Sequence, residues 1–169
     1  LGYVTQKAVL FAGSIRENVF FGESAAPETD EELKNAIELS QAEEFVDKLP
    51  DGAEHMISQM GRNVSGGQKQ RLSIARALSR KPEILVFDDS FSALDSKTDA
   101  KLREGLNEKL KDTTKIIVAQ RISTIRHADK IIVLDRGEAV GMGTHEELMK
   151  NCDVYKEIAL SQLSAAELA

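Results

Sequence analysis

The chain has 169 residues, 41% of them hydrophobic, and its 28 acidic side chains outnumber 22 Lys and Arg to give a formal net charge of −6. This length fits one domain or part of one, and the acidic balance provides no general basic field for binding nucleic acid. The longest purely aliphatic or aromatic run, residues 8–12, has five residues, far fewer than the ~20 that span a bilayer, so no transmembrane helix is expected. Cys152 is the only cysteine, which excludes an internal disulfide and a cysteine metal cluster.

The first third of the chain predicts a strand followed by short helices. Residues 3–5 are typical of a strand, and residues 29–30, followed by two glutamates, mark the start of a helix. Apolar residues then recur at helical spacing as far as the Pro-Asp-Gly turn at 50–52, with a break near Ser40, which predicts two short helices. Residues 55–63 show no clear period and are interpreted as an ordered surface loop.

After Pro82 the pattern becomes that of an α/β protein. Three continuous apolar runs predict strands buried on both faces, namely 84–87, 116–119 and 131–134. Between the first two, residues 99–110 carry leucines spaced four apart and predict a crossover helix. Residues 135–138 predict a hairpin turn, and Thr144 predicts the start of a helix. The expected fold class is α/β, with helices beside a mostly parallel sheet.

A loop and helix at 64–78 form the most informative segment. Ser65 and Gln68 stand three residues apart and can form a reciprocal capping box. The two glycines between them, Gly66 and Gly67, have no Cβ, so an anion could approach the backbone N–H groups and the positive end of the helix dipole. The segment is therefore a candidate phosphate site, although an ordinary capped helix without a ligand explains this motif alone equally well.

About 20 residues later, two carboxylates follow a buried strand. Asp88 and Asp89 end the apolar run 84–87, at the strand end where open α/β sheets bind ligands. Asp88 is suited to hold the Mg²⁺ of a nucleotide, directly or through water. Alone this motif also fits a simple strand-end turn, so the prediction depends on its combination with the glycine loop.

Together the two motifs resemble the nucleotide-binding domain of ATP-binding cassette (ABC) proteins, and the resemblance extends along nearly the whole chain. The matching segments are the signature loop 64–68, the Walker B strand 84–89, the D-loop 92–95 and the Q-loop glutamine Gln6. Two more segments, 10–19 and 143–148, are similar to exporter-type cassettes.

The resemblance implies a partial P-loop NTPase core together with an α-helical signature subdomain. The implied parts are the Q-loop with the start of a linker (1–22), the helical subdomain (23–81), the α/β core (82–150) and a C-terminal helix (151–169). It also implies ATP and Mg²⁺ as ligands, with Gln6 and Asp88 at the metal. The residues implied to contact nucleotide are Gln6, Ser65, Gly66, Gly67, Gln68, Asp88 and Asp95.

Two positions nearest the chemistry depart from the family pattern. Asp89 stands where the family usually has a glutamate that orients the attacking water, and losing one methylene removes roughly 1.5 Å of reach. A misplacement of that order costs about 100-fold in rate. Gln120 replaces the family's switch histidine and can hydrogen-bond a γ-phosphate, but it cannot become cationic or relay a proton. Tolerated variation is the alternative; both changes together favour a site that binds ATP and hydrolyses it poorly.

Cassette domains work as head-to-tail pairs, so the resemblance implies a second nucleotide-binding domain as partner. This chain's signature loop would complete the partner's site, and the hypothesis is a different subunit, or a second half of the same polypeptide, with intact Glu and His. The exporter-like segments imply a multidrug-type exporter at the cytoplasmic face of the cell membrane, moving transmembrane coupling helices through the Gln6 region. No nucleic-acid partner is expected.

The Gly-rich P-loop and its lysine are not among these residues. The expectation is that an N-terminal part carrying the P-loop is absent, that this part of the protein is inactive alone, and that apolar sheet surface is exposed. Two alternatives stay open. One is an ATP-gated regulatory or channel-type module, and the other is a soluble cassette ATPase that acts on DNA or ribosomes.

Overall fold

The computed structural model describes residues 1–23 and 26–163, and its backbone contacts divide the chain into two units. The first unit is Leu1–Val118 and the second begins at Ala119. Each unit is described by itself, and the four-part division expected from the sequence stays a prediction. No helix within the described ranges is both long and apolar enough to cross a membrane.

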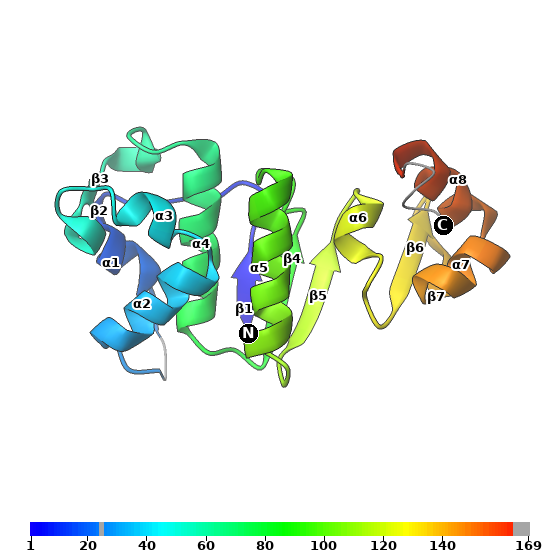
Figure 1. The fold of residues 1–169 in the computed structure, drawn as a ribbon, viewed down its shortest axis with the longest axis horizontal. Coiled ribbons are helices and arrows are strands. Elements are labelled where there is room, and N and C mark those ends of the chain that lie inside the picture. The colour runs from blue at the N-terminus through cyan, green and yellow to red at the C-terminus, as the bar shows by residue number, and fades with distance from the viewer. Residues whose placement is uncertain (24–25, 164–169) are drawn as a thin grey trace. The chain divides into compact units, whose positions relative to one another are not determined.

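A parallel sheet forms the α/β part of the first unit (Figure 1). Its strands, in spatial order, are β1 (Gly2–Val4), β4 (Ile84–Asp88) and β5 (Thr114–Val118). Phe87 of β4 pairs with Val4 on one side and with Ile117 on the other. Helix α5 (Ser96–Lys109) connects β4 to β5 and buries Leu102 and Leu106. The expected parallel strands and crossover helix are thus confirmed.

Short helices form the rest of the first unit. They are α1 (Ile15–Val19), α2 (Asp30–Leu39), α3 (Glu43–Val46) and α4 (Gly66–Ser79), with single 3-10 turns η1 (Gly52–Glu54) and η2 (Gln59–Gly61). The Thr29 hydroxyl accepts from Glu32 N–H and caps α2 at the predicted place, and Ser40 ends that helix. Helix α4 packs against α1, α2 and β1, because its apolar face supplies fully buried side chains such as Leu72 and Ile74.

The interpretation of residues 55–63 as a surface loop is partly wrong. Strand β3 (Met56–Ile57) pairs antiparallel with β2 (Gly13–Ser14), and Ile57 is only 1% exposed. A pair of two-residue strands is too short to show a period, so the sequence carries no signal for it. The Asn63 side chain holds the following turn, accepting from the backbone and hydroxyl of Ser58 and donating to the Met56 carbonyl.

Over residues 119–163, the second unit contains a hairpin and three helices. The elements are α6 (Ile122–Ile125), β6 (Ile131–Asp135), β7 (Glu138–Gly143), α7 (His145–Asn151) and α8 (Asp153–Gln162). Arg136 and Gly137 both have positive φ, as the predicted tight turn requires. Thr144 caps α7 in a reciprocal capping box with Glu147, also as predicted. Of the C-terminal helix expected over 151–169, residues 164–169 lie outside the described residues.

The prediction that three strands are buried on both faces is wrong for β5 and β6, whereas the central strand β4 has Leu85 and Phe87 fully buried on one face and Val86 half-buried on the other. Exposure alternates along β6, where Ile131 and Val133 are buried but Leu134 is 70% exposed, and Val118 on β5 is 52% exposed. In addition, β6 pairs antiparallel with β7 rather than joining the parallel strands. An apolar run indicates burial without indicating which faces are covered, and the described elements cover one face. Exposed side chains such as Val118 and Leu134 form apolar sheet surface, which was expected from the sequence.

Candidate functional site

The carboxylates of Asp88 and Asp89 lie at the carboxyl end of β4. Asp88 is the last residue of the strand, and the backbone N–H of Asp89 donates to the carbonyl of Val118, the last residue of β5, at 2.9 Å. Asp89 has φ +45°, a left-handed conformation that an L side chain rarely adopts outside functional or tightly held sites. Two neighbouring strand ends therefore fix the position of the second carboxylate.

One side chain of β1 and one just after it contact the two carboxylates. Because β1 and β4 are parallel, their carboxyl ends meet at one edge of the sheet. The amide Nε2 of Gln6 donates to Asp89 Oδ2 at 3.1 Å, and the hydroxyl of Tyr3 donates to Asp88 Oδ2 at 2.8 Å. That hydrogen bond, with smaller contributions from desolvation and from the charge of Asp88, raises the pKa of Tyr3. The structure thus brings together Gln6, Asp88 and Asp89, as predicted.

Tyr3 was not predicted from the sequence as a site residue. Tyr3 pairs with Val86, so it shares a sheet face with Asp88, which lies two residues further along β4. That register is the only signal that could have found Tyr3, and it requires knowing which strands are neighbours. Helix α4 also contacts the Q-loop, because Nε2 of the buried Gln70 side chain donates to the Thr5 carbonyl at 3.1 Å.

The D-loop residue Asp95 caps a helix. Its carboxylate accepts from the backbone N–H groups of Lys97 and Thr98 and from the Thr98 hydroxyl, at 2.7–3.1 Å. The Thr98 hydroxyl is the main cause that lowers the pKa of Asp95. Upstream, the Ser92 hydroxyl donates to the Asp89 carbonyl at 2.7 Å and ties the D-loop to the strand end. The expected contact of Asp95 with nucleotide stays a prediction.

The glycine loop caps α4 in the predicted manner. Ser65 N–H donates to Gln68 Oε1 at 2.8 Å, and Gln68 N–H donates to Ser65 Oγ at 3.3 Å. A Cβ on Gly66 would meet no atom within 4 Å, and one on Gly67 would lie 3.5 Å from the Ala93 carbonyl. Packing within the chain therefore does not require glycine at either position. The first-turn N–H groups remain suited to an anion that approaches from outside.

Gln120 belongs to the second unit, where its side chain is exposed. The side chain of Gln162 on α8 holds this segment, donating from Nε2 to the Gln120 carbonyl and accepting at Oε1 from Ile122 N–H, both at 2.9 Å. Gln162 was not singled out from the sequence, because it lies 42 residues from Gln120. The expected hydrogen bond from Gln120 to phosphate stays a prediction.

The donor set at the sheet edge fits Mg²⁺. This cation is usually held by one or two carboxylates with substrate phosphates and water, and the edge offers the Asp88 carboxylate and the amide oxygen of Gln6. Over the described ranges, no cluster of three or more His, Cys, Asp or Glu side chains is placed to enclose a metal ion. An open site completed by a nucleotide matches this arrangement better than a closed structural metal site.

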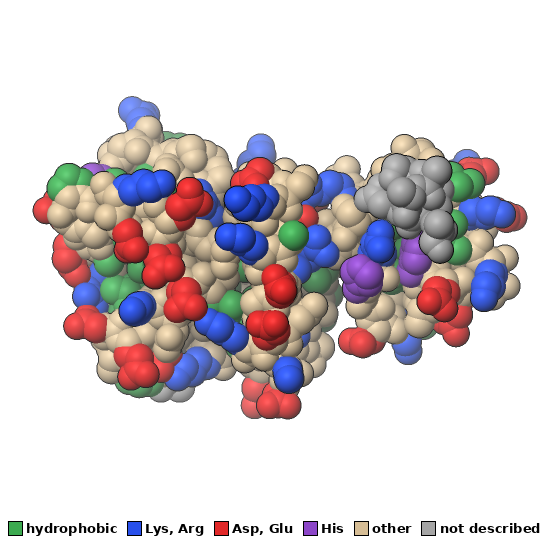
Figure 2. All heavy atoms as spheres, viewed as in Figure 1, with side chains coloured by type: hydrophobic (Ala, Val, Ile, Leu, Met, Phe, Trp, Pro, Cys, Tyr) green, Lys and Arg blue, Asp and Glu red, His purple; other side chains and the backbone are tan. Residues whose placement is uncertain are grey.

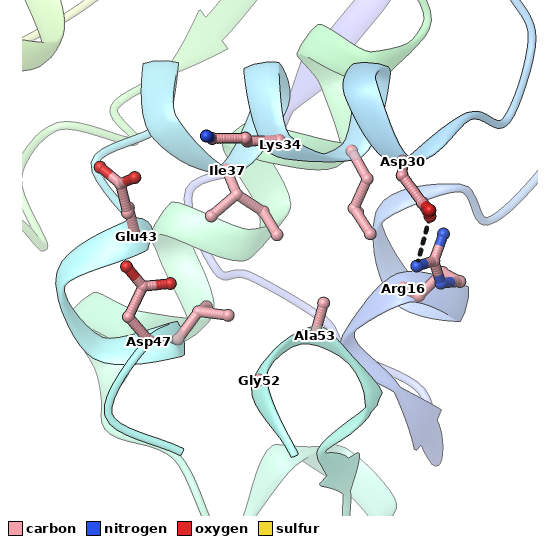
Figure 3. A pocket seen from close by; sticks show the side chains of 10 residues that line it. Arg16, Asp30, Lys34, Ile37, Glu43, Asp47, Gly52 and Ala53 are labelled. Atoms are coloured by element: carbon pink, nitrogen blue, oxygen red, sulfur yellow. Dashed lines mark ion pairs between the residues drawn. The ribbon is translucent and has the colours of Figure 1, made fainter. Parts of the chain in front are cut away.

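A separate hollow of about 310 Å³ lies among the helices of the first unit (Figure 3). Its apolar floor includes Ile37, and its rim carries Glu43, Asp47 and the ion pair of Arg16 with Asp30. It contains none of the predicted site residues. On the face shown in Figure 2, basic and acidic side chains of this unit are interspersed rather than grouped by sign.

Comparison with known proteins places this geometry in a family. The sequence profile described as "ABC transporter" matches residues 1–92. An ABC transporter ATP-binding protein of Mycoplasma genitalium is 45% identical, covering 96% of this chain and 27% of the relative. An export ATP-binding/permease protein of Rickettsia felis is 43% identical, covering 97% of this chain and 28% of the relative.

The fold matches a solved structure titled as a bacterial Atm1-family ABC exporter with ATP bound. The TM-score is 0.88 at 34% identity, covering 95% of this chain and 28% of the exporter chain. The chain thus spans 27–28% of the length of the proteins it matches. With a profile match over more than half of its residues, the chain belongs to the ABC transporter family and is similar to the ATP-binding domain of exporter-type members.

Proposed function

We propose that this chain is part of an ATP-binding domain that drives export across a membrane. The observation that carries the proposal is the sheet edge where Gln6 contacts Asp89 beside the Asp88 carboxylate, in a chain that also has a capped glycine loop at α4. The relatives named for export and the exporter solved with ATP bound support the same function. The phosphate-cradling P-loop would come from outside these 169 residues.

Each side chain at the edge has a role in this proposal. Asp88 and Gln6 would hold Mg²⁺ together with the phosphates, and the ion would offset the negative charge of the phosphates. Asp89, held by Gln6 and by the backbone of Val118, orients the attacking water. Its carboxylate is one methylene shorter than that of glutamate, and Gln120 supplies a neutral hydrogen bond in place of a histidine. We therefore infer slow hydrolysis at this chain's own site.

The signature loop serves the opposite site of the pair. Ser65 and the N–H groups of Gly66 and Gly67 face a γ-phosphate bound by a second nucleotide-binding domain, which is a different subunit or a second half of the same polypeptide. The open space at Gly66 supports this assignment, because no atom of residues 1–23 or 26–163 lies within 4 Å of the place a Cβ would take. Hydrolysis then occurs mainly at the partner's site, which retains glutamate and histidine.

The membrane contact lies on residues 9–21 in this proposal. Val9, Phe11 and Phe21 are 43–58% exposed although they are apolar. Phe11 lies in the exporter-like stretch 10–19, and Val9 and Phe21 lie on either side of that stretch. Exposed apolar side chains grouped in this way mark interaction sites. We assign them to the coupling helices of a transmembrane domain, which places the chain at the cytoplasmic face of the membrane.

The test is ATPase turnover of the full-length protein with its natural partner. Asp89→Glu combined with Gln120→His should raise turnover or leave it unchanged, whereas removing the partner's catalytic glutamate should abolish it. The opposite result, in which Asp89→Ala abolishes turnover and the partner's glutamate is dispensable, would make Asp89 the working base. ATP-dependent flux that continues passively while nucleotide stays bound would instead identify a channel.

A further inference from the structure

The C-terminal half of α4 holds the segment 9–22 through hydrogen bonds to its carbonyl groups. Arg76 donates from Nε to the Asn18 carbonyl at 2.7 Å and from Nη1 to the Val9 carbonyl at 3.0 Å. One turn later, the Ser79 hydroxyl donates to the Val19 carbonyl at 3.0 Å and Arg80 to the Phe21 carbonyl at 2.6 Å. One helix thus fixes the path of the segment.

The Arg76 guanidinium also lies over two aromatic rings. Its central carbon is 5.3 Å from the ring centre of Phe11 and 5.6 Å from that of Phe21, and the two rings stack with centres 4.2 Å apart. Phe11 is 43% and Phe21 48% exposed. The guanidinium therefore supports an aromatic pair that is still accessible from solvent.

Asn18 connects the guanidinium to the backbone of Phe11. Its Oδ1 accepts from Arg76 Nη2 at 3.0 Å and from Phe11 N–H at 2.9 Å, and its Nδ2 donates to the Phe11 carbonyl at 2.9 Å. Asn18 is 2% exposed, so these hydrogen bonds have little competition from water. Both the ring and the backbone of Phe11 are oriented through Arg76.

No carboxylate pairs with Arg76 anywhere in residues 1–23 and 26–163. Carbonyl oxygens and ring faces take the place of a counter-ion. Only a planar fork of several N–H donors can serve three oxygen acceptors and two rings at once, and a lysine ammonium at the same place would lose most of these contacts. The site is therefore specific for arginine rather than for a positive charge.

We propose that Arg76 is a positioning residue that sets the orientation of the Phe11–Phe21 pair relative to α4, so that movement of the signature loop reaches the pair. This inference rests on the proposed function, in which the pair contacts transmembrane coupling helices. Helix α4 begins at Gly66, with Ser65 as its N-cap, and Arg76 lies about three turns further along the same helix. In this proposal, the helix carries a displacement of the capped glycine loop to the aromatic pair.

Arg71 provides a matched control on the same helix. Its Nη1 donates to the Gln41 carbonyl at 2.8 Å, and its guanidinium carbon lies 5.0 Å from the ring centre of Phe45. Phe45 is only 8% exposed, so Arg71 makes the same kind of contact as Arg76 but with a ring that is buried among the helices. Arg71→Lys and Arg76→Lys therefore remove similar interactions with different targets.

The first experiment measures amide hydrogen exchange in the full-length protein in lipid nanodiscs. Arg76→Lys should speed exchange within residues 9–22 by roughly tenfold, whereas Arg71→Lys should change residues 41–46 and leave 9–22 unaltered. Equal exchange in 9–22 for wild type and Arg76→Lys would overturn the proposal. If Arg76→Lys fails to fold, Asn18→Asp is the second variant. It keeps the Oδ1 acceptor but loses the Nδ2 donor to the Phe11 and Ser14 carbonyls, so exchange within residues 9–22 should again rise, and unchanged exchange would overturn the proposal.

The second experiment asks whether the orientation matters at the membrane. A photo-crosslinking phenylalanine analogue at position 21 should join the transmembrane segments in the wild type, and Arg76→Lys should lower that yield at least threefold while Arg71→Lys does not. Equal yields in the two variants would reduce Arg76 to a structural residue. Absence of the cross-link in the wild type would overturn the membrane contact and the transmission step, while hydrogen exchange separately tests the positioning.

Discussion

The two ends of helix α4 are built in opposite ways. At the N-terminal end, the side chains of Ser65 and Gln68 cap each other, and Gly66 has open space around it. At the C-terminal end, Arg76 and its neighbours bind carbonyl groups of a segment that is more than 50 residues away in the sequence. One end is available to a group from outside the chain and the other is committed to the fold. Changes at the two ends should therefore separate activity from stability.

The largest expected effect on stability comes from Arg76→Ala. This change removes the guanidinium donor from the carbonyls of Asn18 and Val9 and from Asn18 Oδ1, which keeps only the Phe11 N–H, and charged hydrogen bonds contribute about 1.5–3 kcal/mol each without being additive. We expect the free energy of unfolding to fall by about 3 kcal/mol, measured by urea denaturation of the full-length protein. Arg80→Ala, which removes one hydrogen bond to an exposed residue, should cost about 1 kcal/mol. Equal losses would contradict the proposed anchoring by Arg76.

At the N-terminal end of α4, Gly66→Ala should lower ATPase turnover without lowering stability. The new Cβ meets no atom of the described residues within 4 Å, and alanine favours the helix, so stability should be unchanged or rise by a few tenths of a kcal/mol. The methyl group would occupy the approach of a phosphate to the first-turn N–H groups, so ATPase turnover of the assembled pair should fall about tenfold or more. Turnover at the wild-type level would show that no anion comes close to this loop.

Ser65→Ala tests whether the N-cap of α4 serves activity as well as stability. Loss of the capping hydroxyl should cost about 1 kcal/mol of stability. Thr29→Ala removes an equivalent cap from α2 and should cost a similar amount. Only Ser65→Ala should also lower turnover, measured at saturating ATP for both variants at a temperature where both are folded. Parallel losses of turnover would mean that Ser65 acts only as a helix cap.

The contacts of this chain that could be predicted from its sequence are the local ones. The Ser65 capping box was predicted because its partners lie three residues apart, and the Asp88 edge was predicted because an apolar run ends there. Tyr3 contacts Asp88 across 85 residues and Arg76 contacts Asn18 across 58. Periodicity carries no information at those distances. The error about strand burial has the same origin, since an apolar run does not reveal which elements cover it.

The smallest expected effect concerns a third helix terminus, at Asp95. Hydrogen bonds from the Thr98 hydroxyl and backbone lower the pKa of Asp95 below its ordinary value of 3.8. The carboxylate therefore stabilises the fold fully above pH 3.8, and this contribution is lost as the pH falls below that value through the folded-state pKa. Asparagine also caps helices well, so Asp95→Asn should be slightly destabilising at pH 7, and the difference from wild type should shrink below pH 3.8. Urea denaturation of both proteins across this range checks the prediction. A difference that does not change with pH would mean that the carboxylate acts at Asp95 only through its shape and not through its charge.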